Sequence, residues 1–138
     1  NADYQRLINI STRGDVGTGE NIVIGGFIVT GNAPKKVLVR AIGPSLTAFG
    51  VAGALADPRL WVFNGAALIA ENDNWSIVPA ETVATAQATR DTGAFGLANG
   101  SKDAALILTL APGAYTAQVS GADGTSTGVA LIEVYEVP

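Results

Sequence analysis

Side chains that could carry out chemistry are few in this chain and widely spaced. The 138 residues include no His and no Cys, so the most common general base and the most reactive nucleophile are missing. The remaining candidates for acid–base work are the carboxylates Asp73, Asp103, Asp123, Glu133 and Glu136. Because their spacing brings no two of them together, we interpret them as solvated turn and edge residues. We predict that the chain is not an enzyme.

Metal and phosphate sites have little support in the sequence. Residues 72–74 and 121–124 offer oxygen ligands of the kind calcium takes, but they match no EF-hand loop and lack its distal Glu. The glycines of residues 14–19 do not form G-x-G-x-x-G, because Ile22 occupies the last glycine position. We interpret these segments as turns, with no metal, no nucleotide and no cofactor.

Aromatic side chains are the best candidates for contacting a ligand. Trp75 follows the polar residues 72–74 and is predicted to be exposed, where its ring could stack on a sugar. Trp61, Tyr115 and Tyr135 lie in predicted strands and are interpreted as core or cross-strand packing residues.

Low charge is the most informative property of the composition. Only 14% of the residues are charged and 48% are hydrophobic, whereas a soluble domain is usually about 25% charged. A chain so poor in charge covers its own surface badly, which predicts burial of part of that surface against other copies, as a homo-oligomer or polymer.

Nucleic acids and membranes are predicted not to be partners. The net charge is −4, and the eight basic residues form no cluster that would bind a phosphate backbone. The longest apolar stretch, residues 22–29, contains two glycines and is far shorter than the roughly 20 residues of a membrane-spanning helix.

Short β runs separated by glycine and proline dominate the chain and predict a single all-β domain over residues 1–138. The fold class is a β-sandwich or jelly roll of about eight strands. The predicted strands are residues 7–11, 21–30, 36–42, 60–63, 66–71, 104–110, 115–119 and 129–135.

Local signals add two helices and one hairpin to these strands. Pro44 precedes a short helix over residues 45–49, and residues 79–90 form a short peripheral helix with an irregular loop as the alternative. Asn64-Gly65 predicts a hairpin with a type I′ turn, in which both residues have positive φ.

The N-terminal residues are predicted to take part in assembly. Residues 1–3 are too polar to be held by their own burial. Residues 4–11 form a β run with little preceding chain to pair with. One hypothesis is that this segment packs on a neighbouring subunit through Tyr4, Leu7, Ile8 and Ile10. The alternative is an ordinary first strand inside its own sandwich.

Several segments together resemble a module of about the same length found, often in tandem, in large secreted and surface proteins of environmental bacteria. The segments are RLINISTR (6–13), GGF (25–27), VRAIGPSL (39–46), LADP (55–58), NDNW (72–75), PGAYT (112–116) and GVALIEVY (128–135). Residues 101–135 also weakly resemble the C-terminal β-sandwich appendages of secreted peptidases. The resemblance implies an exported β module and assigns it no activity or active site.

The sequence therefore favours an extracellular or cell-surface structural subunit, in its mature form after signal-peptide removal. We expect it to self-assemble into a fibre or surface layer, with strand addition between subunits as the joint. The alternative is a secreted glycan-binding or protein-binding β-sandwich module that uses Trp75.

Overall fold

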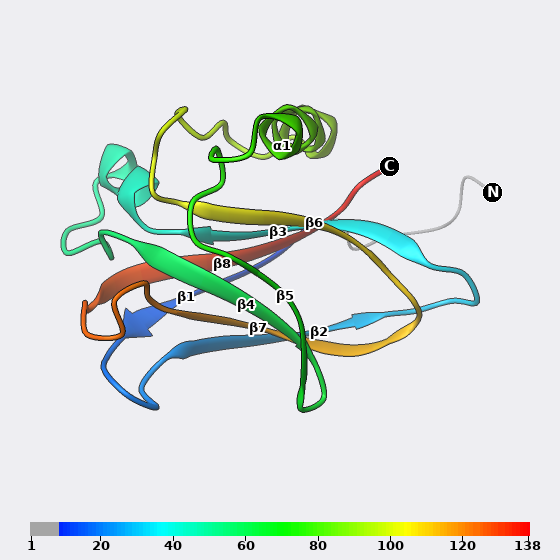
Figure 1. The fold of residues 1–138 in the computed structure, drawn as a ribbon, viewed down its shortest axis with the longest axis horizontal. Helices are drawn as coiled ribbons and strands as arrows, with labels where there is room; N and C mark the ends of the chain where they lie inside the picture. Colours follow the sequence, from blue (N-terminus) through cyan, green and yellow to red (C-terminus); the bar gives the residue numbers. More distant parts are fainter. Residues whose placement is uncertain (1–8) are drawn as a thin grey trace.

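Two four-stranded antiparallel sheets lie face to face in the computed structural model, which describes residues 9–138 (Figure 1). The first sheet has the strand order β1-β8-β3-β6 and the second has β2-β7-β4-β5. The strands are β1 (Asn9–Val16), β2 (Val23–Val29), β3 (Lys35–Ile42), β4 (Pro58–Asn64), β5 (Ala67–Asn72), β6 (Ala104–Leu110), β7 (Gly113–Gly121) and β8 (Gly128–Glu136). A 3₁₀ helix, η1 (Pro44–Phe49), follows β3, and the helix α1 (Pro79–Thr92) follows β5. The predicted all-β sandwich with a short helix is confirmed.

The main core lies between the two sheets and follows from the alternation of side chains along each strand. In β7, Tyr115, Ala117 and Val119 are buried, while the residues between them face outward. The ring of Tyr115 stacks on Phe27 of β2 with centroids 5.6 Å apart.

A second, smaller core covers the outer face of the first sheet. Here Leu38 and Tyr135 pack with Trp75 and with Ala88 of α1. β3 is therefore buried on both faces, in agreement with its continuous apolar sequence and its predicted central place. In Figure 1, α1 lies over this sheet, whereas no helix formed by residues 9–138 lies over the outer face of the second sheet.

The first strand differs from its predicted bounds. β1 continues to Val16, through residues predicted to be a loop, because it pairs in full with β8. Gly14 pairs with Ala130, and a Cβ at Gly14 would lie 3.1 Å from Cγ2 of Val23, so this glycine permits close packing rather than a turn. Ile10 pairs with Val134 and packs against the core of its own domain.

The β4–β5 hairpin is present, but its turn is not type I′. The pairing of Asn64 with Ala67 leaves Gly65 and Ala66 as the two central residues. Gly65 has φ +60°, and among residues 9–138 no residue other than glycine has a positive φ. A positive φ at the first central position only is the pattern of a type II′ turn, which places glycine there.

Replacing Gly65 with valine should lower the free energy of unfolding by about 1–2 kcal/mol, because a β-branched residue is strained in the left-handed region. Gly96→Val is the matched control, since Gly96 has no positive φ and a Cβ there would meet no atom within 4 Å. Urea denaturation of the two variants measures the difference. Equal losses of unfolding free energy in the two variants would show that backbone strain at Gly65 does not cause the destabilisation.

Candidate interaction surface

A buried ion pair joins the two central strands of the first sheet. Arg40 of β3 has no exposed side-chain surface, and its Nε and Nη2 donate to Oε1 of Glu133 at 2.9 and 2.7 Å. Its Nη1 donates to the carbonyl of Phe95 at 2.6 Å. The sequence interpretation of Glu133 as a solvated edge residue is wrong, because β3 and β8 pair Arg40 directly with Glu133 beneath the 93–98 loop.

Tyr135 completes the hydrogen bonds of this pair. The hydroxyl of Tyr135 donates to Oε2 of Glu133 at 2.6 Å, so both carboxylate oxygens have donors. Burial, together with the neighbouring Glu133, raises the pKa of Tyr135 well above its usual range. The guanidinium also lies 4.4 Å from the ring centroid of Phe95. We infer that this network fixes the sheet and its covering loop.

Asp103 is a second buried carboxylate that the sequence analysis interpreted as solvated. It is fully buried and accepts hydrogen bonds from Gly43 N (2.9 Å), Ser45 N (3.3 Å), Ser45 Oγ (2.5 Å) and Ser101 Oγ (2.8 Å). It thus ties the start of η1 to the strand entry at Ser101. None of these donors lies in a strand, where alternation along the sequence would signal burial.

Asp57, a carboxylate that the sequence analysis did not consider, lies close enough to Asp73 for the two groups to interact. Burial, and then the hydrogen bond and charge of Asp73, raise the pKa of Asp57. Neither Oδ1 atom has a hydrogen-bond partner among residues 9–138. Over the same residues, no three acidic, His or Cys side chains are grouped so as to hold a metal ion.

Replacing Asp57 with asparagine should raise the melting temperature at pH 7 and leave it unchanged below about pH 3.8, the ordinary pKa of Asp. A carboxyl with a raised pKa stabilises the fold only while protonated, and this contribution is lost as the pH rises through the raised value. Asp15→Asn removes the same charge from an exposed position and serves as the control. An equal rise in melting temperature in both variants would contradict the raised pKa of Asp57.

The remaining predicted carboxylates have local structural roles. Asp123 Oδ1 accepts from the backbone N–H groups of Thr125 and Ser126, which hold the pKa of this carboxyl below its usual range. Glu136 lies 3.8 Å from Nζ of Lys35. The interpretation of Asp123 as a turn residue agrees with these contacts, whereas that of Glu136 as a solvated edge residue is wrong, because Glu136 lies on the central strand β8 with a side chain only 15% exposed.

Trp75 is buried rather than exposed. Its side chain is 5% exposed, and its Nε1 donates to the carbonyl of Ala98 at 3.1 Å. Of the polar residues before it, Asn72 ends β5 and the next two follow the strand. The ring of Trp75 fills the space under the 93–98 loop, so it has no open face for stacking on a ligand. The burial of Tyr115 and Tyr135 is confirmed. Trp61, interpreted as a core or cross-strand packing residue, lies half-buried on the outer face of the second sheet, where its Nε1 donates to Oγ of Ser120 on the neighbouring strand β7 at 3.2 Å.

This outer face is the most distinctive surface of the molecule. We call it the apolar face and define it by Ile24 and Ile28 of β2, Trp61 and Phe63 of β4, and Leu68 of β5. The exposed fractions of Ile28, Ile24 and Leu68 are 70%, 53% and 44%. Through β7, the pairing aligns Ile24 with Trp61, and it also places Phe63 beside Leu68.

Two charged side chains on the apolar face pair with each other. Arg59 forms an ion pair with Glu71, and its guanidinium lies 4.7 Å from the ring centroid of Trp61. The face is therefore close to neutral, and the polar side chains of Thr116, Gln118 and Ser120 of β7 run between its apolar residues. The sequence analysis missed it, although residues 22–29 are apolar at both alternating positions, which is the signal of a strand with two apolar faces.

Comparison with known proteins adds information on the fold. No model of a protein family matches the sequence, and no curated protein is significantly similar to it. Among solved structures, the chain is similar to the pre-peptidase C-terminal domain of a collagenase from Bacillus anthracis, with a TM-score of 0.52 and 15% identity. The match covers 92% of this chain and 89% of that chain. Within residues 9–138, no helix has both the length and the apolar character needed to span a membrane. At 15% identity, the likeness shows a shared fold.

Proposed function

We propose that this chain is a non-catalytic β-sandwich module of an exported protein and that it acts as a structural subunit associating with other copies of itself. The apolar face carries this proposal. Exposed apolar patches on soluble proteins mark interaction surfaces, and within residues 9–138 no helix lies over this face of the second sheet. The buried carboxylates Asp103 and Glu133 are saturated with structural donors, which supports a role without catalysis.

The charges favour a second copy of the chain as the partner that covers the apolar face. Each copy carries a net charge of −4, so two copies repel each other except where the approaching surfaces are neutral. On the apolar face, Arg59 and Glu71 neutralise each other. Two such faces can stack at the roughly 10 Å spacing of packed sheets and bury Ile24 and Ile28 of both copies.

An extracellular or cell-surface location is part of the proposal. It is supported by the resemblance to modules of secreted and surface proteins and by the fold shared with a C-terminal domain of a collagenase. Repeated association would build a fibre or a surface layer. Of the predicted assembly residues, Tyr4, Leu7 and Ile8 lie outside the described residues and stay a prediction, whereas Ile10 belongs to its own sandwich.

Replacing Ile28 with lysine should weaken self-association at least about tenfold, because burying an isoleucine contributes about 1.5–3 kcal/mol. Val83→Lys is the matched control, since Val83 of α1 is also 70% exposed and the charge change is the same. Sedimentation velocity over a concentration series measures both variants. Identical association of Ile28→Lys, Val83→Lys and the unchanged chain would contradict the use of the apolar face.

A glycan-binding or protein-binding module is the second candidate, favoured by one observation. Trp61 and Phe63 lie on an open sheet face, where aromatic rings can stack on a sugar. Calorimetric titration with soluble polysaccharides would test this. If the unchanged chain stays monomeric and binds a polysaccharide, and Trp61→Ala abolishes that binding, the result would favour a binding module over a structural subunit.

A further inference from the structure

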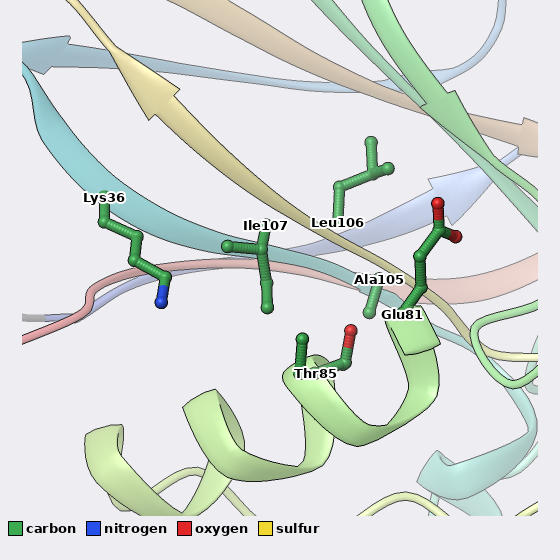
Figure 2. A pocket seen from close by; sticks show the side chains of 7 residues that line it. Lys36, Glu81, Thr85, Ala105, Leu106 and Ile107 are labelled. Atoms are coloured by element: carbon green, nitrogen blue, oxygen red, sulfur yellow. The ribbon is translucent and has the colours of Figure 1, made fainter. Parts of the chain in front are cut away.

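A groove lies between α1 and β6, away from the apolar face. It has a volume of about 270 Å³ and is lined by Glu81 and Thr85 of α1, by Ala105 and Ile107 of β6, and by Lys36 of β3, among others. Figure 2 shows Glu81 beside Ala105 and Lys36 at the other end, with Ile107 between them pointing toward the helix. The groove is thus apolar along its length, with an acid at one end and a base at the other.

The open edge of the first sheet borders this groove. β6 is an edge strand, and the N–H of Ala105 donates to Oδ1 of Asn72 at 3.1 Å, so it points away from β3. Because the strand repeats every two residues, the N–H and C=O groups of Ile107 and Thr109 point the same way. In the part of the chain that the structure describes, no loop or side chain is hydrogen-bonded to them.

An edge strand beside a helix-lined groove is the geometry of strand addition, in which main-chain hydrogen bonds give affinity and pockets select alternate side chains. We propose that this groove accepts residues 1–8 of a second copy as an added strand. The inference rests on the proposed self-association and adds a separate joint to it.

The length and position of residues 1–8 fit this role. Eight extended residues span about 26 Å, enough to follow β6 from end to end. These residues precede Asn9, where β1 begins, and β1 is the opposite edge of the same sheet. Donor and acceptor are therefore different edges, so each copy can give one strand and receive another. Such a head-to-tail joint extends into a filament.

The side chains of the segment complement the groove. In an extended strand, Tyr4, Arg6 and Ile8 share one face. Arg6 is the only basic residue of the segment, and Glu81 is the acid of the groove, with no partner among the described residues. When Arg6 lies beside Glu81, an apolar neighbour lies about 6.6 Å along the strand. The direction in which the added strand runs decides whether that neighbour is Tyr4 or Ile8. In either direction, its side chain lies over Ile107.

A labelled peptide of residues 1–8 tests the joint when it is titrated into the full chain carrying Ile28→Lys, with fluorescence anisotropy as the readout. We expect saturable binding that falls at least tenfold in Thr109→Pro. Proline removes one outward N–H and is tolerated on an edge strand. Thr109→Val keeps the N–H and should bind as the parent does. Thermal melts establish that both variants fold.

A charge exchange keeps the test decisive if Thr109→Pro does not fold. Glu81→Arg should weaken binding of the peptide, and a peptide carrying Arg6→Glu should restore it. Failure of the peptide to bind, equal binding by Thr109→Pro and Thr109→Val, or no rescue by the charge exchange overturns the groove as the joint. If the full chain still self-associates through Ile28 in that case, the proposed function survives. A chain that stays monomeric overturns the proposed function and the joint together.

Discussion

Replacing Arg40 with alanine is expected to lower the free energy of unfolding by about 3–5 kcal/mol, the usual result of removing one partner of a buried ion pair. The substitution would leave the Glu133 carboxylate buried, with the Tyr135 hydroxyl as its remaining side-chain donor. It would also free the carbonyl of Phe95 and so loosen the loop that covers the sheet. Urea denaturation of the variant and the unchanged chain measures the loss.

The pair between Arg59 and Glu71 provides a matched control for this prediction. It has the same chemistry, but its side chains are 34% and 39% exposed, so Arg59→Ala should cost no more than about 1 kcal/mol. The double variant Arg40→Met/Glu133→Leu should recover most of the stability lost in Arg40→Ala, because no unpaired charge remains. Similar losses for Arg40→Ala and Arg59→Ala would contradict the buried network.

Replacing Asp103 with alanine should lower the free energy of unfolding by about 3 kcal/mol or more. The side chain accepts four hydrogen bonds, and each buried group left without a partner costs about 1–3 kcal/mol. Asp103→Asn should recover part of the loss, since one amide oxygen still accepts while the amide nitrogen cannot. Chemical denaturation compares the two variants.

Asp123 is the control for Asp103. It also accepts several hydrogen bonds, but these hold an exposed turn, so Asp123→Ala should destabilise the chain less than Asp103→Ala. The opposite order would show that Asp103 does not organise the entry to η1 as its contacts indicate.

The strands could be predicted from the sequence because their signals are local. Tyr115, Ala117 and Val119 alternate with polar residues, and this alternation predicts β7 before any partner strand is known. Asn64-Gly65 likewise located the β4–β5 hairpin. The turn type was wrong because it depends on the register of the two strands, and pairing Asn64 with Ala67 moves Gly65 to the first central position.

The burial of polar and aromatic residues could not be predicted in the same way. Alternation tells which residues of a strand share a face, but not whether another layer covers that face. Glu133 and Trp75 are buried because α1 and the 93–98 loop cover the first sheet. Ile28 is exposed and Trp61 is only half-buried because, within residues 9–138, no helix covers the outer face of the second sheet. Both outcomes depend on contacts between distant parts of the chain.

Self-association of the chain is the central claim, and sedimentation velocity of the unchanged protein over a range of concentrations and salt tests it most directly. We predict that the weight-average mass rises with concentration. The rise should be steeper at high salt, because screening reduces the repulsion between copies that each carry a net charge of −4. A mass that stays at the monomer value at every concentration and salt would contradict the account.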